Sequence, residues 1–197
     1  LGMHGTYEAN NAMHDCDLLI NIGARFDDRI TGKIDEFSPK SKKVHIDIDP
    51  SSINKIIKVD LALVGDVKEV LKGITKTLKK KNLDLKKSNK QQIAKWWEQI
   101  QKWRTKNSLH FQNSDETIKP QHAVQRLYEL TKHKDTYITT EVGQHQMWAA
   151  QHYKFNKPNR WMTSGGLGTM GYGLPAAVGV QIAHPKKLVI DIAGEAS

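Results

Sequence analysis

Short apolar runs that end in glycine or an acidic residue recur through the first part of the chain. A run at 18–22 is followed by Gly23, a second at 44–49 carries two aspartates, and a third ends at 63–67. A helical pattern at 7–14 comes before them. Short strands separated by helical lengths, each ending in glycine or acid, are typical of a parallel α/β sheet whose strand ends face a ligand. We therefore predict such a sheet in this part of the chain.

A second strand–turn–helix pattern lies in the last third of the chain. The apolar pair at 137–138 precedes a polar turn and a helical pattern at 144–151. The N-terminus of such a helix offers free backbone N–H groups, and His145 stands beside them, which suits a phosphate. A helix of small residues that begins with proline is predicted at 175–182, and a strand at 188–192.

Between these patterns, five glycines fall within the nine positions 165–173. Glycine is costly in chain entropy, so a folded protein keeps it where the backbone approaches a group closely or takes a positive φ. We interpret the run as a cofactor-binding turn that leads into a helix. The alternative is a turn that only lets this helix approach a sheet. The turn and helix at 139–151 favour the first interpretation.

The net charge of +9 comes from one segment. Residues 68–106 hold 13 of the 30 Lys and Arg but only 3 of the 21 Asp and Glu. Apolar residues at 93, 96, 97, 100 and 103 recur there at helical spacing, which favours an amphipathic connecting helix with a solvated lysine face. A polyanion site is the alternative, but basic and aromatic residues without a recognition module are weak evidence for RNA or DNA. We expect no nucleic-acid partner.

Two further features of the composition concern the compartment. No stretch approaches the ~20 consecutive apolar residues of a membrane span, so we expect no membrane partner. The one cysteine, Cys16, lies in a helical apolar pattern and is expected in the core. It has no second cysteine for an intrachain disulfide, which fits a reducing cytoplasm.

Six segments of the sequence match the pattern of one family in order and spacing. In the first part these are LGMHG at 1–5, GARFDDRITGK at 23–33 and HIDID at 45–49. In the last part they are EVGQHQMWAAQ at 141–151, SGGLGTMGYGLPAA at 164–177 and DIAGEAS at 191–197. Over residues 1 to about 75 and 120–197, the chain thus resembles the catalytic subunit of the acetohydroxyacid synthase (acetolactate synthase) family of thiamine diphosphate enzymes.

The resemblance implies an α/β fold with two parallel-sheet domains. Residues 1–78 then form the C-terminal part of a Rossmann-like central domain that binds FAD, and 79–118 form a lysine-rich helical linker. Residues 119–197 form the first part of the domain that binds thiamine diphosphate and Mg²⁺. Because the chain begins at Leu1 and ends inside a turn motif, we expect it to be an internal piece of a longer polypeptide.

For FAD, the resemblance assigns residues at the start of the chain and at the predicted strand ends. Gly23 lets the backbone approach the cofactor, and Arg25 offers a positive fork for its phosphates or flavin ring. Asp47 suits the ribose hydroxyls, because a carboxylate accepts their hydrogen bonds. The expected FAD contacts are Leu1, Gly2, Met3, His4, Gly23, Ala24, Arg25, Phe26, Asp27, Asp47, Ile48, Asp66 and Val67.

Three residues in this part of the chain have a plain structural alternative. His4 precedes a helix and is alternatively a capping histidine without a ligand. Asp66 also suits a helix N-cap, a role compatible with a cofactor contact. The resemblance places Arg29 in the substrate channel, and the alternative is a surface ion pair with Asp28 of little energetic value.

For thiamine diphosphate, the resemblance assigns Gln144 and His145 to the diphosphate. It gives Met170 the task of wedging beneath the cofactor, which suits a bulky and adaptable thioether, and plain packing is the alternative. Glu195 stands where the family has an aspartate that ligates Mg²⁺, and its arm is one methylene longer, so the turn must withdraw slightly for it to supply the oxygen. The expected contacts are Gln144, His145, Gly168, Thr169, Met170, Glu195, Ala196 and Ser197, with Glu195 as the metal ligand.

The activity implied by the resemblance is carboligation. Pyruvate loses CO₂, and the remaining two-carbon unit condenses with a second 2-oxoacid, pyruvate or 2-oxobutyrate, in branched-chain amino acid synthesis. The family's activating glutamate lies outside residues 1–197, so no catalytic acid or base is assigned and the isolated chain is expected to be inactive. The full-length protein is expected to be a homodimer or tetramer with a small regulatory subunit, in the cytoplasm or, in a eukaryote, in a plastid or mitochondrion.

Two alternatives to this activity stay open. Another flavin-containing member of the superfamily, such as pyruvate oxidase or glyoxylate carboligase, shares the cofactor-binding pattern. The segments at 23–29 and 143–148 favour acetohydroxyacid synthase over these enzymes. A non-catalytic module that binds nucleotides or polyanions is the second alternative.

Overall fold

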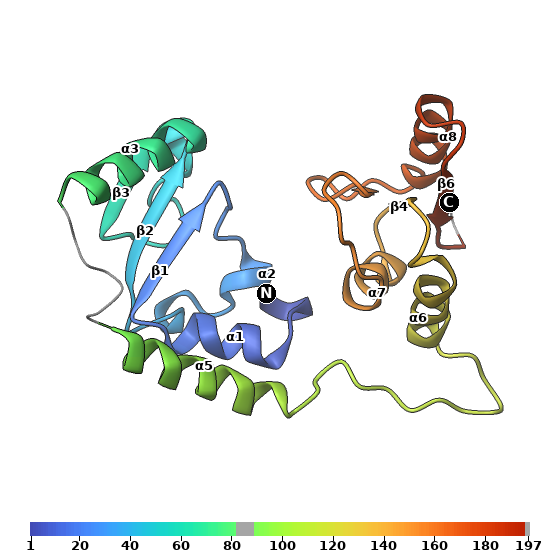
Figure 1. Cartoon of the computed structure of the whole chain (residues 1–197), viewed down its shortest axis with the longest axis horizontal. Coiled ribbons are helices and arrows are strands. Elements are labelled where there is room, and N and C mark those ends of the chain that lie inside the picture. The colour runs from blue at the N-terminus through green and yellow to red at the C-terminus, as the bar shows by residue number, and fades with distance from the viewer. Residues whose placement is uncertain (82–88, 196–197) are drawn as a thin grey trace. The chain divides into compact units, whose positions relative to one another are not determined.

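The computed structural model describes residues 1–81 and 89–195, and these fall into two compact units. The first unit comprises Leu1–Ser108 and the second Leu109–Ser197, so the division lies inside the predicted linker 79–118 (Figure 1). Each unit contains one parallel sheet of three strands. The predicted α/β architecture with two parallel sheets is thereby confirmed.

The sheet of the first unit has the strand order β1-β2-β3. Its strands are β1 (Leu18–Ile22), β2 (Lys42–Asp47) and β3 (Leu61–Val64). Their register places Ile22 opposite Ile46 and Asp47 opposite Val64, so the carboxyl ends of the three strands meet at one edge. The hydrogen bonds between β1 and β2 continue into the turn after β1, because Gly23 N donates to Ile46 O at 2.8 Å.

Four α-helices of the first unit are described. They are α1 (Tyr7–Asp15), α2 (Asp28–Thr31), α3 (Val67–Lys80) and α5 (Lys90–Arg104), with 3₁₀ turns at Gly2–His4, Ile34–Glu36 and Pro50–Ser52. Thr6 caps α1, since its hydroxyl accepts a hydrogen bond from Ala9 N at 3.3 Å. The core between sheet and helices is built on Phe26, Phe37 and Ile57.

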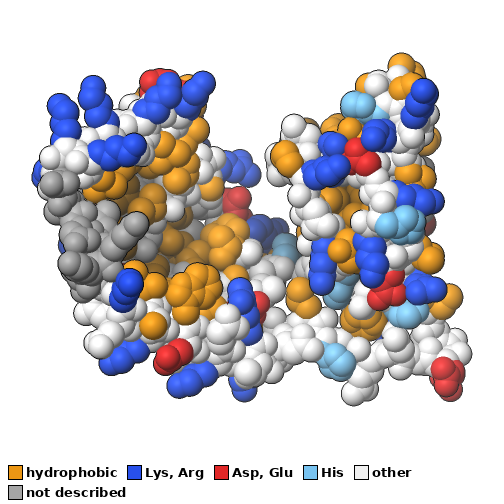
Figure 2. Space-filling model, in the orientation of Figure 1, with side chains coloured by type: hydrophobic (Ala, Val, Ile, Leu, Met, Phe, Trp, Pro, Cys, Tyr) orange, Lys and Arg blue, Asp and Glu red, His pale blue; other side chains and the backbone are white. Residues whose placement is uncertain are grey.

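Helix α5 lies along α1 in the first unit (Figure 1). The helix predicted from the spacing of tryptophans is thus present, and Trp96 and Trp103 meet edge to face with ring centroids 5.6 Å apart. The lysines of α3 are exposed, as the blue side chains along this helix in Figure 2 show. Both observations agree with a solvated basic face. Among the helices of the described residues, none has the length and apolar character to cross a membrane.

The sheet of the second unit has the order β5-β4-β6. Its strands are β4 (Thr136–Thr140), β5 (Trp161–Thr163) and β6 (Leu188–Ile192). The central strand β4 is buried at every position, as expected of a parallel strand covered on both faces. Its register pairs Ile138 with Trp161 on one side and with Ile190 on the other.

Three helices surround this sheet, namely α6 (Pro120–Thr131), α7 (Gln144–His152) and α8 (Gly173–Ala183). Val124, Ile138 and Tyr153 form the centre of the core. Helix α8 begins at Gly173, two residues before the predicted first turn, and a Cβ at Gly173 would strike the carboxylate of Asp191. Glycine at this position therefore lets α8 start close to β6 without displacing the Asp191 carboxylate.

Candidate cofactor-binding sites

A pocket of about 610 Å³ opens at the carboxyl ends of β4 and β6 in the second unit. The residues that line it come from the turn after β4, the first turns of α7, the glycine-rich segment and the turn after β6. They are Glu141, Val142, Gly143, Gln144, His145, Trp148, Met170, Ala193, Gly194 and Glu195. Ligands of open parallel sheets bind at this edge, beyond the carboxyl ends of the strands.

The N-terminus of α7 forms one wall of this pocket. Gly143 is the N-cap with φ 148°, and a Cβ there would lie 2.7 Å from the imidazole of His145, so glycine is required. No side chain of the described residues caps the first turn of α7. Gln146 N already donates to Gly143 O at 3.1 Å, so the N–H groups that precede it and the positive end of the helix dipole are what this helix end offers to an anion such as a phosphate.

Glu141, which was not among the site residues predicted from the sequence, forms the floor of the pocket. Its side chain is 1% exposed. One carboxylate oxygen, Oε2, accepts a hydrogen bond from Gly171 N at 2.8 Å, and the other, Oε1, accepts one from Gly194 N at 3.2 Å. Oε1 also lies 3.7 Å from His145 Nε2. The local signal in the sequence, a carboxylate directly after a strand and before a glycine turn, does not reveal these two long-range hydrogen bonds.

The residues predicted to contact thiamine diphosphate are partly gathered here. Gln144, His145, Met170 and Glu195 all line the pocket. Gly168 and Thr169 belong to the same turn as Met170 but do not line it; Thr169 N donates to Ser164 Oγ at 2.7 Å. Ala196 and Ser197 lie outside the described residues. The contacts themselves stay predictions.

The predicted Mg²⁺ ligand, Glu195, is exposed at the mouth of this pocket. Among residues 1–81 and 89–195, no group of three or more His, Cys, Asp or Glu gathers as a ready metal site. Mg²⁺ is commonly held by one or two carboxylates together with phosphate and water oxygens. The exposed Glu195 carboxylate, in the same pocket as the N-terminus of α7, therefore fits a metal that arrives with a diphosphate.

The residues predicted to hold FAD at the strand ends share one edge of the first sheet. Gly23–Asp27 follow β1, Asp47 ends β2, and Asp66 follows β3. The Asp47 carboxylate accepts a hydrogen bond from Asp49 N at 2.9 Å, and its other oxygen lies 3.5 Å from Nε2 of the fully buried His45. The edge thus presents backbone turns and a fixed carboxylate, which suit a dinucleotide.

Several of these side chains already have structural partners. Phe26 lies in the core, so only its backbone is free to meet a cofactor. Arg25 is exposed and lies 3.6 Å from the Asp27 carboxylate. The predicted N-cap role of Asp66 is confirmed, because it accepts hydrogen bonds from Lys68 N at 2.9 Å and Glu69 N at 3.2 Å. The neighbouring Ala24, Ile48 and Val67 are exposed.

A second cavity, of about 500 Å³, lies in the first unit and is lined by Gly2, Met3 and Arg29 among others. Leu1 and His4, which flank Gly2 and Met3 in the chain, do not line it. Arg29 and Asp28 form an exposed ion pair at 3.6 Å, as the structural alternative expected. Such pairs contribute about 0–1 kcal/mol, so Arg29 stays available for a substrate channel.

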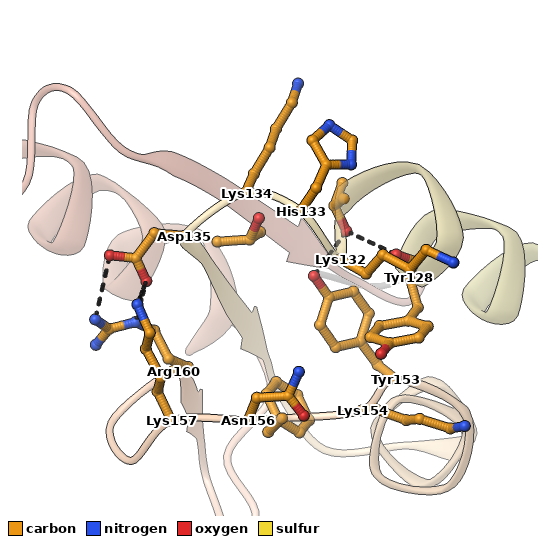
Figure 3. Close-up of a pocket in the computed structure, with 13 residues that line it drawn as sticks. Tyr128, Lys132, His133, Lys134, Asp135, Tyr153, Lys154, Asn156, Lys157 and Arg160 are labelled. Atoms are coloured by element: carbon orange, nitrogen blue, oxygen red, sulfur yellow. Dashed lines mark hydrogen bonds and ion pairs between the residues drawn. The ribbon is translucent and has the colours of Figure 1, made fainter.

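A third cavity, of about 290 Å³, lies at the opposite end of the second sheet (Figure 3). There Asp135, just before β4, is held by Arg160 Nε at 2.8 Å and by Lys187 Nζ at 2.9 Å. Hydrogen bonds from Arg160 first and then from Lys187 keep the pKa of the Asp135 carboxyl well below its usual range. Figure 3 shows Lys134 and His133 pointing away from Asp135 and Arg160. We interpret Asp135, Arg160 and Lys187 as a structural ion cluster that joins the starts of β4, β5 and β6.

Comparisons with known proteins agree with this geometry. Residues 1–74 match the family described as thiamine pyrophosphate enzyme, central domain. Residues 141–197 match thiamine pyrophosphate enzyme, C-terminal TPP binding domain. With these two matches and one parallel sheet in each unit, the chain belongs to the thiamine pyrophosphate enzymes.

Within this family the chain is similar over its whole length to acetolactate synthase large subunits. It is 49% identical to that of Buchnera aphidicola subsp. Schizaphis graminum, covering 33% of that protein, and 46% identical to the isozyme 3 large subunit of Escherichia coli, covering 34%. It is 45% identical to acetolactate synthase 1, chloroplastic, of Nicotiana tabacum, covering 29%. The chain thus spans about a third of the length of the curated relatives it matches. The family resemblance stated from the sequence is confirmed.

Proposed function

We propose that the full-length protein is an acetolactate synthase, which decarboxylates pyruvate and condenses the two-carbon unit with a second 2-oxoacid. The observation that carries the proposal is the pocket at the carboxyl ends of β4 and β6. It joins a helix N-terminus free for a diphosphate to an exposed carboxylate suited to Mg²⁺. Similarity to acetolactate synthase large subunits along all 197 residues supports this member of the family over pyruvate oxidase or glyoxylate carboligase.

In this proposal, different residues of the chain bind different parts of the cofactor. The N–H groups of the first turn of α7, with Gln144 and His145, bind the diphosphate. Glu195 holds the metal, and Met170 supports the organic part of the cofactor from the glycine-rich turn. Trp148, half-buried at the wall of the pocket, excludes water from it. When bound, thiamine diphosphate supplies the carbon nucleophile that the side chains of proteins lack.

We further propose that the first unit holds FAD along the edge formed by Gly23–Asp27, Asp47 and Asp66, and that Leu1–His4 also contact it. Arg29 then lines the path of the substrate. The names of the relatives as large subunits support a partnership with a small subunit, in a dimeric or tetrameric enzyme. The free thiol of Cys16 fits a reducing compartment, the cytoplasm or, in a plant, the chloroplast.

The proposal is tested with the full-length protein and pyruvate. Acetolactate, measured as acetoin after acidification, should form only when thiamine diphosphate, Mg²⁺ and FAD are all present. The isolated chain of 197 residues should form none under the same conditions. Absence of acetolactate from the fully supplied full-length protein would contradict the proposal, and hydrogen peroxide in its place would favour pyruvate oxidase.

A further inference from the structure

Three separate segments of the pocket at the carboxyl ends of β4 and β6, which we propose binds thiamine diphosphate, meet at the buried carboxylate of Glu141. It follows β4 directly, and its side chain is 1% exposed. The glycine-rich turn reaches it through Gly171 N, and the turn after β6 reaches it through Gly194 N. The two bonds span 30 and 53 residues of sequence, so they are tertiary links and do not belong to a local turn.

Each of these links ends next to a predicted cofactor contact. Gly171 follows Met170, and Gly194 precedes Glu195. A shift of either glycine N–H would therefore move the thioether or the metal ligand beside it. Hydrogen bonds from backbone N–H groups to a buried carboxylate are charge-assisted and costly to break, so they restrain these two positions, the shorter bond to Gly171 N more tightly than the longer one to Gly194 N.

The imidazole of His145 adds the third segment. Its Nε2 lies 3.7 Å from Oε1 of Glu141, and its ring fills the space that a Cβ at Gly143 or Gly194 would take. Glu141 thus lies against His145, one of the two side chains of α7 that we assign to the diphosphate. The same carboxylate faces the helix, the glycine-rich turn and the acidic turn.

We propose that Glu141 is a positioning residue for the cofactor of this enzyme: its carboxylate holds the backbone beside Met170 and Glu195 at the spacing that thiamine diphosphate and Mg²⁺ require. It acts through two backbone N–H groups and not by contact with the reacting atoms. The inference rests on the proposed function, since it concerns the same pocket. It predicts that the neutral isostere weakens cofactor binding while leaving the flavin and the rest of the fold in place.

The test is Glu141→Gln in the full-length protein. The amide of glutamine keeps one acceptor but turns an N–H donor toward the second glycine N–H, so one of the two links is lost. Calorimetric titration with thiamine diphosphate in saturating Mg²⁺ should give a Kd raised about tenfold or more. The matched control is Glu129→Gln on α6, the same chemical change at an exposed carboxylate 3.1 Å from Arg126.

Hydrogen exchange of the protein without thiamine diphosphate separates positioning from general weakening. In Glu141→Gln, peptides over 165–173 and 193–195 should exchange faster while those of α6 and of the first unit stay unchanged. A uniform increase across the protein, or a Kd equal to that of the Glu129→Gln control, would overturn the inference. If Glu141→Gln does not fold, Glu141→Asp, which keeps the charge but cannot span both links, carries the same two measurements and the same contradicting outcomes.

A protein without substitutions that fails to bind thiamine diphosphate at all would overturn the proposed function together with this inference. Normal binding that is insensitive to Glu141 would overturn the inference alone. The two failures are therefore distinguishable in one set of titrations.

Discussion

At the scale of single residues, substitution of Glu195 is the most direct test of the proposed metal site. Glu195→Gln in the full-length protein keeps the size of the side chain but removes its anionic oxygen. Loss of groups that merely support a metal ligand costs about 10- to 100-fold in metal affinity, so loss of the ligand itself should raise the Mg²⁺ requirement at least as much. The Mg²⁺ activation curve of acetolactate formation measures this, with flavin content unchanged.

Glu195→Asp is the matched control for that substitution. It restores the family's usual ligand in a turn built for a longer arm, so part of the activity should remain. A Glu195→Gln curve that overlays that of the unmutated enzyme, in both Mg²⁺ and thiamine diphosphate, would show that the metal is held elsewhere.

A second residue-scale prediction concerns pH and Asp135. Because Arg160 and Lys187 lower the pKa of this carboxyl in the folded protein, its contribution to stability is complete above the unfolded value of about 3.9 and is lost as the pH falls through the folded value. Asp135→Asn should therefore lower the melting temperature at pH 7, and the difference should shrink steadily below about pH 4. Asp115→Asn, at an exposed carboxylate, is the control, and a deficit independent of pH would contradict the ion-cluster interpretation.

The sequence predicted four of the residues that line the pocket at the carboxyl ends of β4 and β6 but missed Glu141. Gln144, His145, Met170 and Glu195 stand in local patterns whose chemistry is readable along the chain. The role of Glu141 depends on two glycine N–H groups 30 and 53 residues away, and no local spacing reveals that approach. Long-range hydrogen bonds of this kind become visible only with the fold.

At the scale of elements, two strands with strong apolar runs were predicted with the correct bounds, and a short strand without such a run was not predicted. The strands predicted at 18–22 and 188–192 have those bounds in the structure. The three-residue strand β5 was not predicted, because it is defined by its pairing with β4 and not by a run of its own. Likewise, the start of α8 is set by its approach to Asp191 and not by Pro175.

Helix α3 offers a prediction at this scale. Asp66→Ala removes the acceptor for Lys68 N and Glu69 N, which should lower the free energy of unfolding by about 1 kcal/mol. Asp66→Asn, which can still cap, should lose only part of this. Urea unfolding followed by circular dichroism measures both. Equal stability of the alanine and unmutated proteins would mean that the cap contributes nothing to α3.

At the scale of the whole molecule, the two units are assigned different cofactors, and this division is testable. Arg25→Ala in the full-length protein should release FAD, because it removes the positive fork from the turn after β1. Substitution of the lysines at 79–81 by alanine should not, although it removes more charge. Fluorescence of the flavin released by heat reports the content, and equal retention in both variants would reject the assignment of the strand-end edge.

The most direct test of the whole account is an experimental structure of the full-length protein with thiamine diphosphate and Mg²⁺. We predict the diphosphate at the N-terminus of α7 beside Gln144 and His145, with Mg²⁺ between it and a Glu195 carboxylate oxygen. Met170 should lie against the organic part of the cofactor. A diphosphate bound away from α7, or a Mg²⁺ shell from which Glu195 is turned away, would contradict the account.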